Sequence, residues 1–354
     1  MRNKSIALIM PSLPSGGAEK VMSILANEFV SMNIEVHLIL FLENIVFFDI
    51  DERVIIHYPK YKKKNKMRII YSFNSILFLR RKLIEIKPTA SLTFGGRYNS
   101  FSIISALGLN INSFISDRSQ PGISYGFLQD IINSYCYKFA KGIICQTIRS
   151  KELTTVKTKH KNIEIIANPI QSISNNNKSK EKIIINVGRF VKDKNQEELI
   201  QIFNSININD DWKLFFIGDG PTLNQCKELV KNIKREDSIL FKGQLTDVIS
   251  ELQNAAIFAF TSKSEGFPNA LAEALSCGCA CISYNCVAGP SDLITNDDNG
   301  YLIPLNDINN YKLKLEELMK DEGKRNYYGN QGVSSVMKLN KNHVVNHYLN
   351  FIFG

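Results

Sequence analysis

The chain has 354 residues, of which 44% are hydrophobic and 22% are charged, and its formal net charge is +9. This length predicts two domains that each bury a core, and the composition excludes an intrinsically disordered chain. No apolar run approaches the roughly 20 residues that span a bilayer, and Ile6–Met10 is too short for a signal peptide. The sequence therefore predicts a globular protein without a membrane-spanning helix.

The chain contains seven cysteines, an odd number that favours free thiols in a reducing compartment. Three of them stand close together in Cys277-Gly278-Cys279-Ala280-Cys281. Their one-residue spacing does not suit zinc, and no histidine lies nearby. We interpret them as small buried residues that lead into a strand, and we expect no metal site.

In the first half of the chain, short apolar runs alternate with amphipathic stretches, as in a doubly wound α/β domain. The runs that predict buried parallel strands are Ile6–Met10, Val36–Phe41, Ser91–Phe94, Ser113–Ser116 and Ile143–Gln146. The stretches that predict helices between them include Ala18–Ser31 and Ser124–Ala140. Gly16 and Gly17 join the first strand to the first helix, where free amides favour a phosphate or a sugar. A plain strand-to-helix turn is the alternative explanation.

Residues 60–82 form a basic segment with aromatic and aliphatic residues but no acidic one. Such a segment favours contact with an anionic membrane, and a solvated loop followed by an ordinary packed helix is the alternative. The basic residues expected to make this contact include Lys62, Lys63, Lys64, Arg68, Arg80 and Arg81. Nucleic acid is not an expected partner, because no recognition motif accompanies the charge.

A polar stretch at residues 169–182 predicts a linker, after which the alternation of strands and helices restarts. The predicted strands are Ile183–Val187, Leu214–Ile217, Ile239–Phe241, Ile257–Thr261 and Ala280–Ser283. The predicted helices include Asn195–Phe203, Pro221–Ile233, Pro268–Ser276 and Asn340–Phe353. We therefore predict domains at residues 1–168 and 183–335 and a C-terminal helix within residues 336–354. A ligand is expected in the cleft between the domains, at the carboxyl ends of the strands.

The most informative stretch covers residues 264–274 and places Glu265 and Glu273 eight residues apart. Glu265 lies on a predicted loop, and Glu273 lies about one turn inside the helix that follows. Gly266 between them lets a ligand approach the backbone closely. The amides expected to face an anion at this helix start are those of Phe267, Asn269 and Ala270. Solvated charges beside a buried helix are the alternative interpretation.

This two-glutamate segment resembles the signature of retaining, nucleotide-sugar-dependent glycosyltransferases of the GT-B fold, in particular the large bacterial family four. Further motifs of that family follow the expected order along nearly the whole chain. They are Ser15-Gly16-Gly17-Ala18-Glu19, Asn168-Pro169, Val187-Gly188-Arg189, Lys192-Asp193-Lys194-Asn195, Ile217-Gly218-Asp219-Gly220-Pro221, Phe241-Lys242-Gly243 and Ala288-Gly289-Pro290-Ser291-Asp292. The resemblance implies two Rossmann-like domains that face a central cleft, with the last helix crossing back onto the first. It assigns the acceptor to residues 1–168 and the nucleotide sugar to residues 183–335.

The resemblance also implies roles for single residues. Arg189 and Lys194 hold the donor diphosphate, and Glu265 faces hydroxyls of the donor sugar, so these three are the expected catalytic residues. Glu273 accepts hydrogen bonds from the ribose. The other expected donor-binding residues are Gly16, Gly17, Gly188, Lys242, Gly243, Gly266, Phe267, Asn269 and Ala270.

The loop after Ser113–Ser116 departs from the family, because many relatives carry a histidine there and this chain has none. We expect Asp117 or Arg118 to take the place of that group; the alternative is that Arg118 binds an acidic group of the acceptor.

The reaction implied is the retaining transfer of a hexose or N-acetylhexosamine from a UDP-sugar, preferred over a GDP-sugar, to a hydroxyl of a lipid-linked saccharide. Such enzymes assemble bacterial surface polysaccharides and glycans, including lipopolysaccharide O-antigen. No metal or other cofactor is expected, because arginine and lysine supply the positive charge. The protein is expected in the cytoplasm, at the inner face of the cell membrane. A sugar-nucleotide epimerase or hydrolase, or an inactive nucleotide-sugar-binding subunit, are the alternatives.

Overall fold

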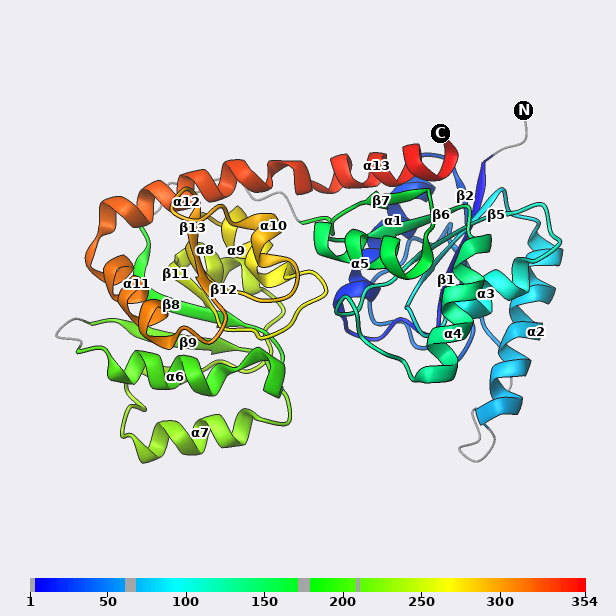
Figure 1. Cartoon of the computed structure of the whole chain (residues 1–354). Coiled ribbons are helices and arrows are strands. Elements are labelled where there is room, and N and C mark those ends of the chain that lie inside the picture. Colours follow the sequence, from blue (N-terminus) through cyan, green and yellow to red (C-terminus); the bar gives the residue numbers. More distant parts are fainter. Residues whose placement is uncertain (1–3, 61–67, 171–178, 208–210) are drawn as a thin grey trace. The chain divides into compact units, whose positions relative to one another are not determined.

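The computed structural model describes residues 4–60, 68–170, 179–207 and 211–354, and the chain divides into two compact units (Figure 1). The first unit contains Met1–Pro169 and Asn342–Gly354, and the second contains Ile170–Lys341. Each unit has one parallel β-sheet with helices on both faces. The predicted fold class, two doubly wound α/β domains, is therefore confirmed.

Within the described residues, the sheet of the first unit has seven parallel strands in the order β3-β2-β1-β4-β5-β6-β7. The strands are β1 (Ser5–Met10), β2 (Glu35–Leu40), β3 (Ile55–His57), β4 (Ala90–Phe94), β5 (Asn112–Ser116), β6 (Gly142–Cys145) and β7 (Ile163–Ile165). Because β1 pairs with both β2 and β4, the order of the strands reverses at β1 and creates a topological switch point. The edge strands β3 and β7 were not predicted, since three residues are too few to show a period.

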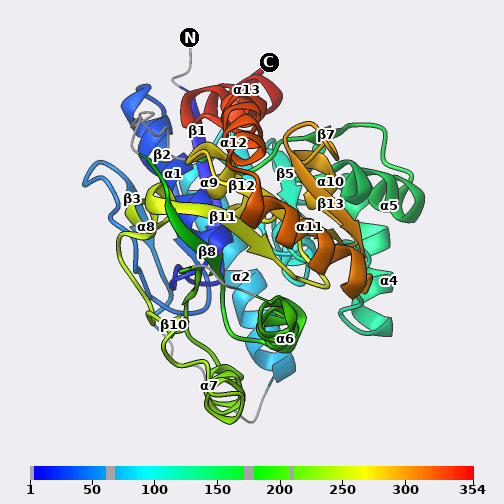
Figure 2. The same cartoon turned by 90° about the vertical axis from the view of Figure 1, so that its left-hand side faces the viewer.

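Helices cover both faces of this sheet. They are α1 (Gly17–Ser31), α2 (Arg68–Ile86), α3 (Asn99–Ala106), α4 (Phe127–Cys136), α5 (Ile148–Thr158) and α13 (Lys341–Phe353). Leu8 of β1 points to the face packed by α1 and α13, and its neighbour Ile9 points to the face packed by α2 and α3. Figure 2 shows α13 beside β1 and α1, and its Val345 and Tyr348 are buried there. The predicted return of the last helix to the first domain is confirmed.

One predicted helix is shorter in the structure. The pattern over Ser124–Ala140 predicted a single helix, whereas α4 begins at Phe127 and ends at Cys136, followed by a 3₁₀ helix at Tyr137–Phe139. Gly126 precedes α4 with φ = 104°, a left-handed conformation outside the helical range, so the helix cannot extend back through this residue.

In the part of the second unit that the structure describes, the sheet has six parallel strands in the order β10-β9-β8-β11-β12-β13. The strands are β8 (Glu181–Val187), β9 (Lys213–Ile217), β10 (Ile239–Phe241), β11 (Ala255–Phe260), β12 (Ala280–Asn285) and β13 (Gly300–Pro304). Because β8 lies between β9 and β11, this sheet has its switch point at β8. Residues 171–178 of the predicted linker lie outside the described residues, and β8 begins two residues before the predicted domain.

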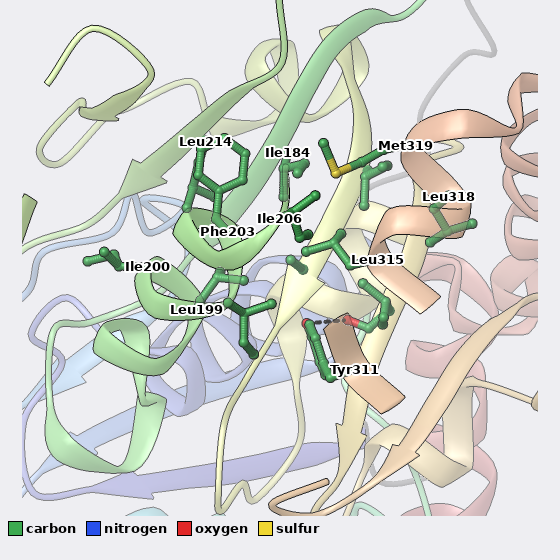
Figure 3. Packing of buried hydrophobic residues seen from close by; sticks show 14 of the residues in the cluster. Ile184, Leu199, Ile200, Phe203, Ile206, Leu214, Tyr311, Leu315, Leu318 and Met319 are labelled. Atoms are coloured by element: carbon green, nitrogen blue, oxygen red, sulfur yellow. Dashed lines mark hydrogen bonds between the residues drawn. The ribbon is translucent and has the colours of Figure 1, made fainter. Parts of the chain in front are cut away.

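The helices of the second unit also lie on both faces of its sheet. They are α6 (Gln196–Ser205), α7 (Leu223–Asn232), α8 (Val248–Asn254), α9 (Asn269–Ser276), α10 (Pro290–Leu293), α11 (Ile308–Lys320) and α12 (Glu322–Val336). In Figure 2, α6, α7 and α11 lie on one side of the strands and α8 and α9 on the other. Figure 3 shows Phe203 of α6 and Leu315 of α11 over the sheet residues Ile184 and Leu214. This core fixes the strand ends from which the candidate site is built.

Candidate active site

Loops at the carboxyl ends of β8, β9 and β10 are joined by backbone hydrogen bonds. The amide of Gly188, after β8, donates to the carbonyl of Ile217 at the end of β9 over 3.0 Å. The amide of Gly218 donates to the carbonyl of Gly243, after β10, over 2.8 Å. Three predicted motifs that are far apart in the sequence therefore meet at one edge of the sheet, where doubly wound domains bind ligands.

Two glycines make this close approach of loops possible. Gly218 has φ = 138°, and a Cβ atom on it would lie 2.1 Å from the carbonyl oxygen of Gly188. Gly220 has φ = 155°, and its Cβ would lie 2.3 Å from the carbonyl oxygen of Phe190. Asp219 between them accepts the amide of Phe190 through its own carbonyl at 2.9 Å. This motif therefore supports the shape of the loop that follows β8.

The structure brings Lys194 and Glu265 together. Lys194 ends a 3₁₀ helix (Lys192–Lys194) after β8, and its Nζ lies 2.5 Å from Oε1 of Glu265, on the loop after β11. Only 8% of the Glu265 side chain is exposed, and the ammonium group lies 5.5 Å from the centre of the Phe260 ring. Because β8 and β11 are neighbours at the switch point, this ion pair marks the position where a ligand is expected.

Backbone contacts hold the two loops of this ion pair in place. The amide of Lys263 donates to the carbonyl of Asp193 over 2.7 Å. The buried hydroxyl of Thr261 lies 3.2 Å from the carbonyl oxygen of Lys194 and 3.1 Å from that of Asn195. Sequence reasoning gave Thr261 and Lys263 no role, because their function depends on a loop almost 70 residues away.

Arg189 lies on the same loop as Lys194 but in a different environment. Its side chain is exposed, and in the part of the chain that the structure describes no acidic group pairs with it. Its carbonyl accepts a hydrogen bond from the side chain of Gln196 at 3.2 Å, which steadies the backbone. Gly188 stands beside Lys194, since a Cβ there would lie 3.8 Å from Cδ of that lysine. The loop after β8 thus presents the paired cation of Lys194 and the exposed cations of Arg189 and Lys192.

The start of α9 lies directly after the Glu265 loop. Pro268 is the N-cap residue, so the helix begins at Asn269 and not at Pro268 as predicted. The amide of Asn269 donates to the carbonyl of Phe267 over 3.0 Å. One of the three amides predicted to face an anion is therefore already hydrogen-bonded within the chain. Those of Phe267 and Ala270 have no acceptor among the described residues, so they suit the predicted role. Glu273 is half-buried within α9.

The loop after β12 packs against this helix start. Gly289 has φ = 99°, and a Cβ on it would lie 2.3 Å from Cδ of Pro268. Cys286 on the same loop is buried, and burial together with the nearby Glu265 raises the pKa of its thiol to about 11. The loops after β8 to β12 therefore share one edge of the second sheet. The Ala288-Gly289-Pro290 motif was identified from the sequence, and its contact with Pro268 shows that Gly289 lets this loop pack against the start of α9.

The amide of Lys242 donates to the carbonyl of Phe216 in β9 over 2.9 Å, while its side chain contacts α8. Nζ of Lys242 lies 2.9 and 2.8 Å from the two carboxylate oxygens of Glu251, and 4.4 Å from the centre of the Phe215 ring. Gly243, with φ = 69°, offers its carbonyl to the loop after β9. A donor role for these two residues would depend on main-chain atoms, and it stays a prediction.

In the first unit, Gly16 is the N-cap residue of α1, and a carboxylate lies over it. A Cβ on Gly16 would lie 2.2 Å from Oε2 of Glu19, which shows how closely this side chain folds back. Burial raises the pKa of the Glu19 carboxyl. The predicted anion position at Gly16 and Gly17 is therefore approached by a carboxylate of the chain itself.

Asp117 and Arg118 follow β5, and both have partners inside the first unit. Asp117 accepts hydrogen bonds from the hydroxyl of Tyr125 at 2.9 and 3.1 Å, and burial raises its pKa. The guanidinium of Arg118 donates to Oδ1 of Asn168 at 2.5 Å and to the hydroxyl of Tyr348 on α13. Arg118 thus joins β5 to the C-terminal helix. The roles predicted for both residues at the acceptor stay predictions.

The predicted membrane segment is described only in part. Of the six basic residues expected to contact the membrane, three lie outside the described part of the chain: Lys62, Lys63 and Lys64. Arg68 is the first residue of α2, and Arg81 is exposed. Arg80 donates to the carbonyl oxygens of Ser105 and Leu107 at 3.1 and 2.8 Å, so its guanidinium supports the end of α3. In the described residues, no helix has the length and apolar character to cross a membrane.

Residues 168–334 match the family model described as Glycosyl transferases group 1. This range contains all five loops and the Lys194–Glu265 ion pair. Residues 168–334 are a group 1 glycosyltransferase domain. The family resemblance predicted from the motifs is therefore confirmed. Within the described residues, no group of three or more His, Cys, Asp or Glu side chains is placed to hold a metal ion, and independence from metal stays a prediction.

Similarity to known proteins extends beyond the group 1 domain. The chain is 25% identical over 377 residues to an N-acetylgalactosamine-N,N'-diacetylbacillosaminyl-diphospho-undecaprenol 4-alpha-N-acetylgalactosaminyltransferase of Campylobacter jejuni, covering 99% of this chain and 100% of the relative. The apo lipopolysaccharide outer core galactosyltransferase WaaB is similar with a TM-score of 0.79, 19% identity and 99% coverage of both chains. HepE of Anabaena in complex with UDP is similar with a TM-score of 0.80 and 13% identity, and the match covers 98% of both chains. These structural likenesses confirm the GT-B fold class.

Proposed function

We propose that the protein is a retaining glycosyltransferase that moves a hexose or N-acetylhexosamine from a UDP-sugar to a hydroxyl of a lipid-linked saccharide. The observation that carries this proposal is the Lys194–Glu265 ion pair, which lies at the switch point of a group 1 domain. Arg189, on the same loop as Lys194, adds an exposed cation. A site with two cations and one carboxylate suits a substrate with both a diphosphate and sugar hydroxyls.

In the proposed reaction, the bond between the anomeric carbon and the leaving phosphate oxygen breaks. The acceptor hydroxyl oxygen bonds to the same carbon on the same side, so the anomeric configuration is retained, and its proton passes to the departing phosphate. Negative charge grows on the nucleoside diphosphate as this bond breaks. Arg189 and Lys194 stabilise that charge, and these two side chains thereby do what a metal ion does in other transferases.

Glu265 has two functions in this proposal. One carboxylate oxygen holds the ammonium group of Lys194 at 2.5 Å, which fixes the cation before the substrate arrives. The other oxygen accepts hydrogen bonds from hydroxyls of the donor sugar. Glu273 on α9 accepts hydrogen bonds from the ribose, and the amides at the start of α9 face the diphosphate.

The substrates and the location are proposed from the relatives. The name of the Campylobacter jejuni relative includes a diphospho-undecaprenol saccharide, which supports a lipid-linked acceptor, and the HepE complex with UDP supports a UDP-sugar donor. Such an acceptor places the enzyme at the inner face of the cell membrane, in assembly of a bacterial surface polysaccharide or glycan. The exposed apolar residues Ile70, Phe73 and Leu77 of α2, within the basic segment, support peripheral contact with an anionic membrane.

The first experiment measures thermal stability with UDP, GDP, ADP or CMP in the presence of EDTA. A nucleotide at about 100 times its dissociation constant adds roughly 2.7 kcal/mol of stability, which shifts the melting midpoint by several degrees. A shift with UDP alone is expected. A shift with GDP alone would refute the proposed donor class, and a lack of any shift would refute the donor site.

A second assay separates a transferase from the alternatives. It incubates labelled UDP-hexoses and UDP-N-acetylhexosamines with and without an undecaprenyl-diphosphate-linked saccharide. The proposal expects release of UDP only with the acceptor, and a product in which the anomeric configuration of the donor is kept. Release of UDP without an acceptor would instead indicate a hydrolase.

A further inference from the structure

The first unit contains a cavity of about 270 Å³ that is lined by α4, α5, β6 and the loop after β5. Figure 2 shows α4 and α5 as neighbours. Ile143 and Cys145 of β6 are buried at the inner end of the cavity. Ile123 and Val156 are 43% and 78% exposed, so they lie at its mouth. The cavity shares no residue with the loops of the second unit and is a separate feature of the molecule.

A buried carboxylate, that of Asp117, lines this cavity. Its Oδ1 accepts the amide of Ser119 at 3.1 Å and the hydroxyl of Tyr125 at 2.9 Å. Among the described residues, no lysine or arginine forms an ion pair with it, and burial raises its pKa. A carboxylate can accept about four hydrogen bonds. Asp117 therefore keeps part of its accepting capacity for a ligand.

Hydroxyl groups surround the carboxylate. The hydroxyl of Ser134 on α4 donates to the carbonyl of Asp130 over 2.8 Å, and that of Thr158 on α5 donates to the carbonyl of Thr154 over 2.7 Å. Because their hydrogens are used within the helices, these oxygens can only accept from a ligand. The residues with hydroxyl groups that line the cavity include Ser119, Tyr125, Ser134, Ser150, Thr154 and Thr158.

A cavity rich in acceptors selects a ligand that brings hydrogen-bond donors. A phosphate group brings acceptors and negative charge, which the carboxylate of Asp117 repels. An acyl chain would leave the polar groups unpaired. A sugar ring carries hydroxyl donors at its edge and C–H groups on its faces, and the faces can contact Ile123, Leu153 and Val156. Cavities for drug-sized ligands measure about 300–1,000 Å³, so this smaller one suits a single ring.

We propose that the cavity between α4 and α5 binds one neutral sugar ring, whose hydroxyls donate to Asp117 and to the hydroxyl oxygens of Ser134 and Thr158. A sugar of the lipid-linked acceptor and a free glycoside have this same chemistry. Binding needs neither the nucleotide sugar nor the transfer reaction, so it goes beyond the proposed function. Assignment of the ring to the acceptor does rest on the proposed function.

The first test titrates the full chain, without nucleotide, with the methyl α-glycosides of glucose, galactose, N-acetylglucosamine and N-acetylgalactosamine. Saturation-transfer NMR gives the dissociation constants, and at least one glycoside is expected to bind. Thr154→Leu places a larger apolar side chain in the cavity and should raise the dissociation constant about tenfold or more. Its matched control is Thr155→Leu, which changes the next residue of α5. Thr155 is exposed and does not line the cavity, so less than about a twofold change is expected.

A second variant, Asp117→Asn, tests the chemistry without filling the cavity. It keeps the size of the side chain but replaces an accepting oxygen by a donating amide, so affinity should fall about tenfold or more. Inorganic phosphate should not displace the glycoside. The proposal is overturned if no glycoside binds, or if both variants melt like the wild type and bind the glycoside equally well.

Kinetics then distinguish the two sources of the ring. If it belongs to the acceptor, Thr154→Leu raises KM for the lipid-linked saccharide and leaves KM for the UDP-sugar unchanged. Loss of glycoside binding with unchanged kinetics assigns the cavity to a free sugar. A wild type that binds the glycoside but transfers no sugar would refute the proposed function alone, so the two failures are distinguishable.

Discussion

Replacing Lys194 by methionine tests whether the Lys194–Glu265 ion pair serves catalysis or only structure. Glu265 is 8% exposed, so the variant leaves a buried carboxylate without its cation. Loss of one partner of a fully buried pair costs about 3–5 kcal/mol, and the 24% exposure of the Lys194 side chain places this site lower. We expect the free energy of unfolding to fall by about 2–3 kcal/mol.

The double variant Lys194→Met/Glu265→Gln separates the two roles. It removes both charges, so no buried carboxylate remains, and the loss of stability should shrink to about 1 kcal/mol. Catalysis should not recover, because the cation that we propose to stabilise the leaving diphosphate is still missing. Both variants should lose about 100-fold in kcat/KM, or roughly 3 kcal/mol of transition-state stabilisation.

The assay combines guanidinium chloride unfolding with initial rates of UDP release in the presence of acceptor. Full activity of the Lys194→Met variant would refute the assignment of Lys194 to the diphosphate. Activity that returns together with stability in the double variant would show that the ion pair only supports the fold.

Three further predictions follow from the second unit. Arg189→Ala should lower kcat/KM about 100-fold with little change in the free energy of unfolding. The control is Lys227→Ala on α7, which changes another exposed cation and should leave kcat/KM and the free energy of unfolding unchanged in rate and denaturation assays. Gly218→Ala places a Cβ 2.1 Å from a carbonyl oxygen and should lower the free energy of unfolding, measured by denaturation, by more than about 3 kcal/mol. In Gly243→Ala the new Cβ meets no atom within 4 Å, so the expected loss is about 1 kcal/mol. Burial raises the pKa of Cys286 from 9.0 to about 11, so this thiol stabilises the fold below pH 9 and that contribution is lost as the pH rises towards 11. The other six cysteines are also buried and have a raised pKa, so they lose stability over the same range in both proteins. Denaturation at pH 8 and 10 should therefore show a loss of unfolding free energy that is about 1 kcal/mol smaller in Cys286→Ala than in the wild type.

The long apolar runs predicted the central strands closely, because a buried strand with helices on both sides needs apolar residues on both faces. The prediction of Val36–Phe41 differs from β2 by one residue at each end, and that of Leu214–Ile217 differs from β9 by one. The short strand β13 was missed, since Gly300 and Pro304 leave too few residues between them to show a pattern.

The candidate site shows where sequence reasoning ends. Family motifs identified Lys194 and Glu265 separately, but their spacing of 71 residues carries no sign that the two side chains form an ion pair. The partners of Arg118 are still more remote, with Tyr348 lying 230 residues away in the chain. Such contacts depend on how the sheet brings loops together, and the local spacing of apolar residues in the sequence does not indicate which loops meet.

Helix α13 makes the completion of the first unit depend on residues that are synthesised after the second unit. Residues 342–354 belong to this unit, and Val345 and Tyr348 of α13 fill its core beside α1. During translation, residues 1–169 therefore emerge first but expose an apolar sheet face until the whole second unit has been made. Domains usually fold as they emerge, and exposed apolar surface promotes aggregation. The nascent first unit should thus depend on a chaperone for longer than the second unit, whose large core cluster, among the described residues, comes from Ile184 to Tyr328.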